Sequence, residues 1–360
     1  MELRRRASTT SAQSASRSSA KTILITADIH LSANPANEYR WQLFPFLKKL
    51  AKRYAASGLW VLGDLTDAKD RHPGEFVNRL TAAFVHLHPT FDFVEILKGN
   101  HDYSRNGEPF FRFLSRFPHI RYYSSPVQTS RFGHACHFIP HTTDGNAVLS
   151  ALQHSSADVL LLHHTFNGAV AGSVPLEGTD TADVRKRGRL ILSGDVHMPQ
   201  VVGPVEYVGA PYHQTFGDSF LPRVGLLSFS DEGVSFTEIS TASEFPSKRT
   251  VVSASRDELV EQLQLFVPGD SVRVRLSLSK SDFFEFEQLR ALAQEQCLSL
   301  GLHLHGVEVL PRKVLMHRRV SSRAPQLAVS SEDHFSAYCT RLRISNEVRA
   351  VGRTLLKDIT

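Results

Sequence analysis

Residues 59–67 read Leu-Trp-Val-Leu-Gly-Asp-Leu-Thr-Asp, an apolar run that leads directly into a glycine and two carboxylates. A short apolar run without polar alternation is typical of a strand that is buried on both faces. Four further runs follow the same pattern, at residues 22–26, 93–97, 159–162 and 190–192. Each of the five runs is followed at once by side chains that can bind metal ions. In chain order these are Asp28, His30, Asp64, Asn100, His163, Asp195 and His197.

Helical patterns separate the apolar runs, most clearly over residues 41–55 and 75–87. Strands that alternate with helices predict an α/β layer fold. In such sheets, ligands bind beyond the carboxyl ends of the strands, where the loops converge. After Tyr207, two strand-like segments around a turn at 231–233 predict an antiparallel hairpin that closes the domain. We therefore predict one α/β domain over 21–242, with its site at the strand ends.

A second, smaller unit is predicted over residues 246–314. Ser255 and Glu258 have the spacing of a helix capping box. Residues 272–278 alternate like a strand, 282–297 have a helical pattern, and 302–310 are again strand-like. These features predict a small β-α-β accessory domain. Residues 331–360 carry two amphipathic stretches, which predict paired helices that bind a partner.

Two basic segments lie outside these units. Residues 1–20 are rich in Ser, Arg and Ala, a composition that cannot bury enough surface to fold. They are expected to be a disordered tail, with a phosphate-binding arm or an organellar import signal as alternatives. Residues 315–330 are expected to be a linker. In and beside it, Arg312, Lys313, Arg318, Arg319 and Arg323 are candidate contacts to DNA phosphates, with a solvated linker as the alternative.

The composition excludes several classes of protein. No run of about 18 apolar residues is present, so we expect no membrane span. The three cysteines are far apart, which argues against a disulfide scaffold or a cysteine-based zinc module. The net charge of +5 leans weakly toward polyanionic partners. The 18 histidines direct attention to metal chemistry.

The candidate ligands combine carboxylates, imidazoles and one amide. This set suits Mn²⁺, Fe or Zn²⁺ better than Ca²⁺, which prefers shells made only of oxygen. We interpret Asp28 and His30 as lying two residues apart in an extended chain, so that both side chains face the same way. The same interpretation applies to Asp195 and His197. The glycines before Asp64, Asn100 and Asp195 are expected to allow tight turns beside an ion.

These motifs resemble the calcineurin-like metallophosphoesterase superfamily, whose pattern is Asp-x-His, Gly-Asp-x-x-Asp, Gly-Asn-His-Asp, a later His, and Gly-His-x-His. The resemblance covers residues 21–229. It implies a four-layer α/β sandwich with two divalent metal ions, and phosphoester hydrolysis by a metal-bridging hydroxide. Metal one would take Asp28, His30, Asp64 and His197. Metal two would share Asp64 and take Asn100, His163 and the residue at 195.

Position 195 departs from that pattern, because Asp195 stands where the superfamily has His. A carboxylate favours a harder ion, such as Mn²⁺ over Zn²⁺. We therefore expect two divalent ions, with Mn²⁺ first and Mg²⁺, Fe or Zn²⁺ as alternatives. Three interpretations remain open: a working variant site, a weakened second site, or a site lost to catalysis.

Three acidic or imidazole groups are expected to support the reaction. His101 is the candidate general acid, and Asp102 would orient its ring. Asp67 is expected to support the ligands without binding metal.

Further features resemble the SbcD-type DNA repair exonucleases. These are residues 197–200 (HMPQ), residues 207–211 (YVGAP), and the small domain with paired helices that follows. The resemblance implies an Mn²⁺-dependent nuclease for DNA. It also implies a homodimer bound to an SbcC-type coiled-coil ATPase through the C-terminal helices. We expect a cytoplasmic, nucleoid-associated protein.

Two alternatives stay open. One is a phosphoesterase for cyclic nucleotides or phosphoproteins, which would bind no DNA. The other is a non-catalytic scaffold, in which Asp195 marks a degraded metal site and the C-terminal helices supply the function.

Overall fold

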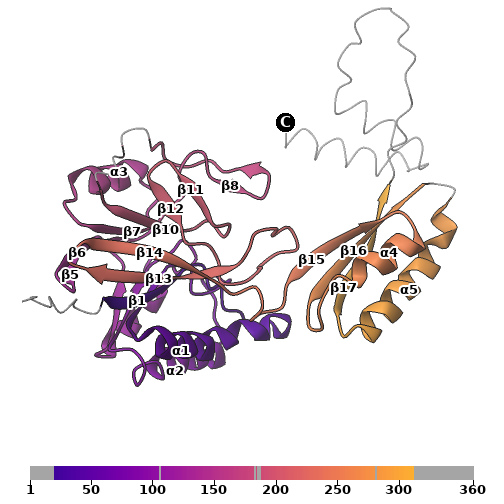
Figure 1. The fold of residues 1–360 in the computed structure, drawn as a ribbon, viewed down its shortest axis with the longest axis horizontal. Coiled ribbons are helices and arrows are strands. Elements are labelled where there is room, and N and C mark those ends of the chain that lie inside the picture. Colours follow the sequence, from indigo (N-terminus) through magenta and orange to yellow (C-terminus); the bar gives the residue numbers. More distant parts are fainter. Residues whose placement is uncertain (1–19, 105–106, 182–183, 185–187, 280–281, 312–360) are drawn as a thin grey trace, which may run out of the picture. The chain divides into compact units, whose positions relative to one another are not determined.

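The computed structural model describes residues 20–104, 107–181, 184, 188–279 and 282–311 (Figure 1). The predicted linker, the paired C-terminal helices and nearly all of the N-terminal tail lie outside these residues. So do the five basic candidates for DNA contact, Arg312, Lys313, Arg318, Arg319 and Arg323. Within the described residues, no helix has the length and apolar character needed to cross a membrane.

The first of two six-stranded sheets has the order β14-β13-β1-β2-β3-β4. Strands β1 to β4 are parallel to one another, and β13 joins β1 in the antiparallel sense. The predicted hairpin is confirmed as β13 and β14. The strands are β1 (Lys21–Thr26), β2 (Ala56–Leu62), β3 (Phe93–Leu97), β4 (Ile120–Tyr123), β13 (Arg223–Ser230) and β14 (Gly233–Ser240).

The second sheet has the order β11-β12-β10-β7-β6-β5. Its four central strands are parallel, and its two edge strands are antiparallel to their neighbours. The strands are β5 (Val127–Arg131), β6 (His134–Ile139), β7 (Val159–His163), β10 (Leu190–Gly194), β11 (Gln200–Val202) and β12 (Val205–Tyr207). A short ribbon of β8 (Val170–Ala171) and β9 (Val174–Pro175) forms a separate two-stranded sheet.

Alternation along each strand divides its apolar side chains between two cores. In β1, Ile23 and Ile25 enter a core shared with β6, β7 and β10, whereas Leu24 enters a core shared with helices. Those helices are α1 (Leu43–Tyr54) and α2 (Gly74–Val85). Helix α3 (Gly145–His154) packs on the outer face of the second sheet, opposite α1 and α2 in Figure 1. The predicted α/β class is confirmed.

The predicted helix over 41–55 begins later than expected. A 3-10 helix, η1 (Pro35–Gln42), precedes α1, which starts at Leu43. The reason is Pro45, because a proline ring clashes with the carbonyl four residues earlier. Pro45 is tolerated in the first turn of α1, where backbone N–H groups lack helical partners in any case. A second 3-10 helix, η2 (Phe110–Arg116), precedes β4.

The smaller unit is a three-stranded parallel sheet with two helices and a hydrophobic core of its own. Its middle strand alternates between buried and half-buried residues, as the sequence predicted. The first strand, β15, was not predicted, and its sequence KRTVVS carries only a weak apolar signal. The elements are β15 (Lys248–Ser253), α4 (Arg256–Leu263), β16 (Ser271–Leu278), η3 (Asp282–Glu285), α5 (Phe286–Ser299) and β17 (His303–Pro311).

Candidate metal centre

The ends of five parallel strands bring the predicted ligands together. β1, β2 and β3 of the first sheet supply one group, and β7 and β10 of the second sheet supply the other. Two hydrogen bonds join the groups across the sheets. His163 Nδ1 lies 2.7 Å from the carbonyl oxygen of Leu62, and the backbone N–H of Asp195 donates to Asp28 Oδ1 at 3.0 Å.

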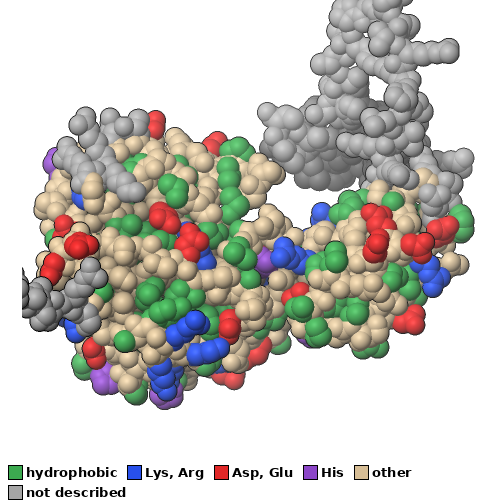
Figure 2. Space-filling view, viewed as in Figure 1, with side chains coloured by type: hydrophobic (Ala, Val, Ile, Leu, Met, Phe, Trp, Pro, Cys, Tyr) green, Lys and Arg blue, Asp and Glu red, His purple; other side chains and the backbone are tan. Residues whose placement is uncertain are grey.

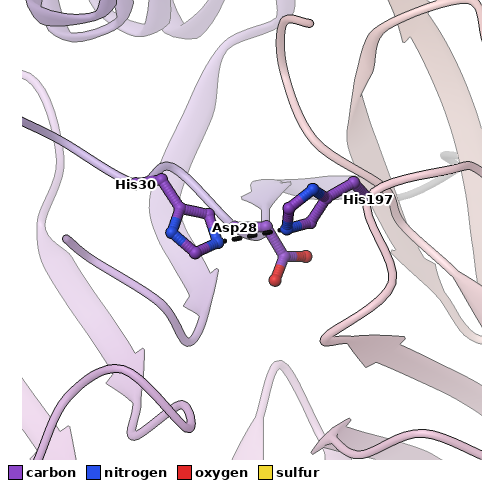
Figure 3. Close-up of side chains that lie close together, drawn as sticks. All are labelled: Asp28, His30 and His197. Atoms are coloured by element: carbon purple, nitrogen blue, oxygen red, sulfur yellow. Dashed lines mark hydrogen bonds between the residues drawn. The ribbon is translucent and has the colours of Figure 1, made fainter. Parts of the chain in front are cut away.

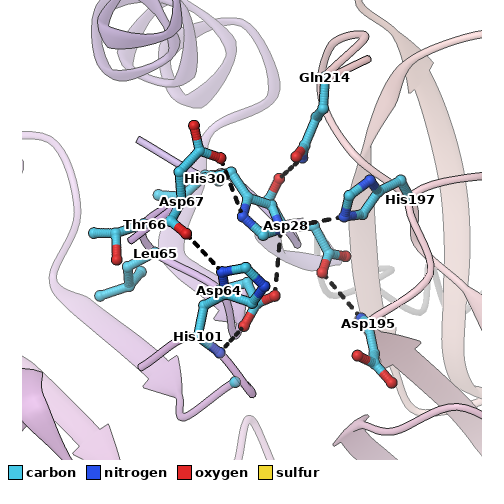
Figure 4. Close-up of polar contacts among 12 residues, drawn as sticks. Asp28, His30, Asp64, Leu65, Thr66, Asp67, His101, Asp195, His197 and Gln214 are labelled. Carbon is cyan, nitrogen blue, oxygen red and sulfur yellow. Dashed lines mark hydrogen bonds and ion pairs between the residues drawn. The ribbon is translucent and has the colours of Figure 1, made fainter. Parts of the chain in front are cut away.

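Asp64 occupies the middle of this arrangement (Figure 4). Its Oδ2 lies 3.3 Å from His30 Nε2, and its Oδ1 lies 3.4 Å from His163 Nε2. One carboxylate therefore presents an oxygen to each of two ligand clusters. This is the arrangement that a bridging ligand requires.

Cluster one consists of Asp28, His30, Asp64 and His197. The Nε2 atoms of His30 and His197 lie 3.1 Å apart, and the Asp28 carboxylate lies beside them (Figure 3). Ligand atoms of Asp28, His30 and His197 all fall within 4.8 Å of one another. Two ring nitrogens that face each other need a proton or a cation between them, so this cluster suits a metal ion.

Cluster two consists of Asp64, His163 and Asp195. The predicted ligand Asn100 stands between Gly99, which packs against Asp64, and His101, whose backbone N–H donates to Asp64 Oδ1. His163 Nε2 lies 3.5 Å from Asp195 Oδ1. Since a carbonyl can only accept a hydrogen bond, His163 carries its proton on Nδ1, toward Leu62. Its Nε2 is thereby directed at the two carboxylates, where a bound metal ion would take the Nε2 lone pair.

Several of these ligand atoms are buried without a hydrogen-bond partner. They include Asp28 Oδ2, Asn100 Oδ1 and His163 Nε2. Buried polar atoms are nearly always hydrogen-bonded, because an unpaired one costs free energy. Since Asp28 and His163 belong to groups of side chains that could hold a metal ion, divalent cations are the partners that would satisfy their unpaired atoms. The residues present therefore fit two metal ions.

The pKa values within the site reflect its excess of buried carboxylates. Burial raises the pKa of Asp28 to about 7, against the opposing effect of His163. Burial also acts to lower the pKa of His163, but Asp64 and Asp195 outweigh it and raise that pKa well above its usual value. In Asp195, burial acts to raise the pKa, but the nearby His163 and the hydrogen bond from Thr165 outweigh it and lower the pKa to about 2. Asp195 is thus an ionised carboxylate that faces cluster two.

Comparison with known proteins agrees with this chemistry. Residues 21–199 match the family model of the calcineurin-like phosphoesterases. These residues belong to the calcineurin-like phosphoesterase family. The family is metal-dependent, so this domain is a metal-dependent hydrolase by family. No curated protein matches the chain.

Two solved structures resemble the chain at low identity. One is described as a novel archaeal phosphodiesterase, with a TM-score of 0.36, 12% identity, and coverage of 61% of this chain and 99% of that chain. The other is described as GAP50, the anchor in the inner membrane complex of Plasmodium, with a TM-score of 0.41, 9% identity, and coverage of 62% and 85%. These scores are too low to indicate a substrate.

The backbone of the phosphoesterase domain differs from the prediction at its ligands. Asp28, His30, Asp64 and Asp195 have positive φ angles of 52°, 37°, 53° and 79°, so none of them is in extended chain. Asp28 and His30 do share cluster one. Asp195 and His197, however, face different clusters, which corrects the expectation that both point the same way. Left-handed backbone at four non-glycine residues is costly, and such strain is typical of functional sites.

Two of the neighbouring glycines are required for space rather than for a turn. A Cβ on Gly99 would lie 2.1 Å from Asp64 Oδ1, and a Cβ on Gly194 would lie 2.3 Å from the carbonyl oxygen of Leu62. Any side chain at either position would displace the ligands of the phosphoesterase domain. The role expected for these glycines therefore changes from turn formation to close packing.

The environment of His101 corrects another expectation. Its Nδ1 donates to the carbonyl oxygen of Asp67 at 2.9 Å, so Asp67, rather than Asp102, orients the ring. The Asp102 carboxylate instead accepts hydrogen bonds from the backbone N–H groups of Gly99, Asp64 and Leu65. Asp102 therefore fixes the loops after β2 and β3 to each other.

Sequence reasoning missed three residues that support the ligands. Arg40 is buried and donates to the carbonyl oxygen of His30 and to the Asp67 carboxylate. The Thr165 hydroxyl donates to Asp195 Oδ2, and the Gln214 side chain donates to the carbonyl oxygen of Asp28. These residues have no recognisable spacing from the motifs, so only the fold reveals them.

Proposed function

We propose that this chain is a two-metal phosphodiesterase that cleaves DNA. The observation that carries the proposal is the Asp64 carboxylate, which presents one oxygen to each of two clusters that contain unpaired ligand atoms. Two ions sharing one carboxylate are typical of enzymes that displace an oxygen at phosphorus.

When bound, the ions would supply Lewis acidity, which activates water and neutralises the phosphoryl oxygens. The protein's own contribution is to position the side chain that protonates the leaving oxygen. The Asp67 carbonyl fixes the Nδ1–H of His101, which leaves Nε2 to face the site (Figure 4). In its protonated form, His101 gives the Nε2 proton to the departing oxygen and becomes the neutral imidazole that keeps its Nδ1–H on the Asp67 carbonyl. Asp102 holds the loops that carry His101 and Asp64 in fixed relative positions, because its carboxylate accepts hydrogen bonds from three backbone N–H groups of these loops.

The choice of DNA rests on the SbcD-like segments at 197–200 and 207–211, which surround β11 and β12. The small parallel sheet after the phosphoesterase domain adds support. Charge adds little, because basic and acidic side chains are interspersed on the face shown in Figure 2. The oxygen of Asp195 favours Mn²⁺ over Zn²⁺.

A nuclease assay on linear double-stranded and single-stranded DNA, with Mn²⁺, Mg²⁺ or chelator, tests the proposal. We expect Mn²⁺-dependent cleavage that disappears in Asp64→Ala. His101→Ala should retain metal binding and cleave about a hundredfold more slowly. The matched control is Asp231→Asn, which alters an exposed carboxylate in the β13–β14 turn and should cleave normally.

Cyclic nucleotide and phosphopeptide substrates belong in the same assay. Turnover of either, with DNA left intact, would refute the DNA assignment and retain the metal chemistry. No hydrolysis of any substrate with any ion would refute both.

A further inference from the structure

A cavity of about 260 Å³ lies beside cluster two and plays no part in the mechanism above. It opens at the carboxyl ends of β3, β4 and β6, next to the strand ends that carry the metal ligands. The ring centroids of His141, in its wall, and His163, in cluster two, are 6.2 Å apart. Its polar lining consists of Lys98, Tyr103, Ser124, Ser125, His141 and Thr142.

Lys98 is the unusual member of this lining. Its side chain is only 7% exposed, and no carboxylate in the described part of the chain lies within ion-pair distance of it. Lysine is almost never buried unless it is paired.

Other buried charges in the same domain do have partners. Glu95 accepts hydrogen bonds from Trp60, Tyr123 and Arg131. Arg40 pairs with Asp67 at 2.8 Å. Lys98 thus differs from these groups, because it faces a cavity instead of a counter-charge.

The walls of the cavity are held in place around the ammonium group. Lys98 Nζ lies 4.2 Å from the centre of the Tyr103 ring. The Tyr103 hydroxyl donates to the carbonyl oxygen of His141 at 2.9 Å, and the His141 N–H donates to the carbonyl oxygen of Lys98 at 2.9 Å. The serine hydroxyls across the cavity add donors. A small anion would therefore find a positive charge and hydroxyl donors already arranged.

We propose that this cavity binds a phosphate group, separate from the phosphate that reacts at the metal centre. Two sources share this chemistry: a neighbouring phosphate of the substrate strand and free inorganic phosphate. The first source rests on the proposed function, and the second does not.

Calorimetric titration of metal-stripped protein with inorganic phosphate tests the site directly. Without metals, the carboxylate-rich clusters repel anions, so binding reports on the cavity. We expect Lys98→Met to weaken binding at least about tenfold and Lys98→Arg to retain it. Ser125→Ala, at an exposed position, should weaken phosphate binding about fivefold. This variant replaces Lys98→Met in the test if Lys98→Met fails to fold. Absence of binding to the wild type, or undiminished binding to Lys98→Met, would overturn the proposal.

Kinetics then distinguish the two sources. For a substrate phosphate, Lys98→Met should raise the KM for an oligonucleotide about tenfold and leave hydrolysis of bis(p-nitrophenyl) phosphate, which has one phosphate, unchanged. For free phosphate, the variant should hydrolyse both substrates like the wild type and still lose phosphate binding. If the wild type hydrolyses neither substrate, the proposed function is refuted. The titration still shows whether the cavity binds phosphate.

Discussion

At the scale of single residues, the metal centre depends on ligands whose backbone has unfavourable, positive φ angles. The four ligands with positive φ would relax in an isolated peptide, and the surrounding hydrogen bonds prevent this. Asp195 shows the effect clearly. Its N–H is held by Asp28, its Oδ2 by Thr165, and its remaining oxygen faces His163.

Asp195 is therefore expected to bind the second metal. Asp195→Ala should lower the metal content from two ions toward one and weaken the second site at least about tenfold. Asp195→His should keep two ions and shift the preference toward Zn²⁺, because imidazole is a softer ligand. Elemental analysis after equilibrium dialysis measures both. Two normally bound ions in Asp195→Ala would show that Asp195 is no ligand.

At the scale of elements, the two faces of β6 contact different parts of the domain. Cys136 and Phe138 enter the core between the sheets, whereas His137 lies among buried groups near the end of α3. His137 Nδ1 lies 3.0 Å from Ser155 Oγ, and burial lowers the pKa of this histidine. His134, Cys136 and His137 thus have structural roles in β6.

The lowered pKa of His137 predicts a loss of stability in acid. Between its folded pKa and the ordinary value of 6.5, the unfolded state binds more protons, so the free energy of unfolding falls as the pH falls. Between pH 7.5 and 5.5 this costs at most about 1.4 kcal/mol.

Urea unfolding of the wild type and His137→Gln at both pH values measures the effect. The variant should lose less stability on acidification than the wild type. Equal losses in the two proteins would contradict the prediction, and the comparison cancels contributions from the other histidines.

At the scale of the whole molecule, the metal centre lies between two sheets that also share an apolar core and the Arg131–Glu95 ion pair. Its ligands come from both sheets, and the pKa of Asp28, raised to about 7, reflects the burial of a carboxylate that lacks a cation. Metal ions are therefore expected to stabilise the fold as well as to support catalysis.

Chelation should lower the melting temperature. Free Mn²⁺ at about a hundred times its Kd adds about 2.7 kcal/mol to the free energy of unfolding, provided that the unfolded chain does not bind it. Thermal unfolding followed by circular dichroism, with Mn²⁺ or after chelation, tests this. Asp64→Ala should show a much smaller shift. A wild type that melts at one temperature in both conditions would contradict the prediction.

The five apolar runs and the polar residues after them determined strands β1, β2, β3, β7 and β10, the α/β class and the candidate metal ligands. This was possible because buried strands and metal ligands both demand particular residue types at particular places. Only the tertiary structure showed the positive φ angles of four ligands, transferred the orientation of His101 from Asp102 to the Asp67 carbonyl, and revealed the supporting roles of Arg40, Thr165 and Gln214. Backbone angles, backbone acceptors and contacts between distant segments leave no periodic trace in a sequence, because they arise only when the strand ends meet.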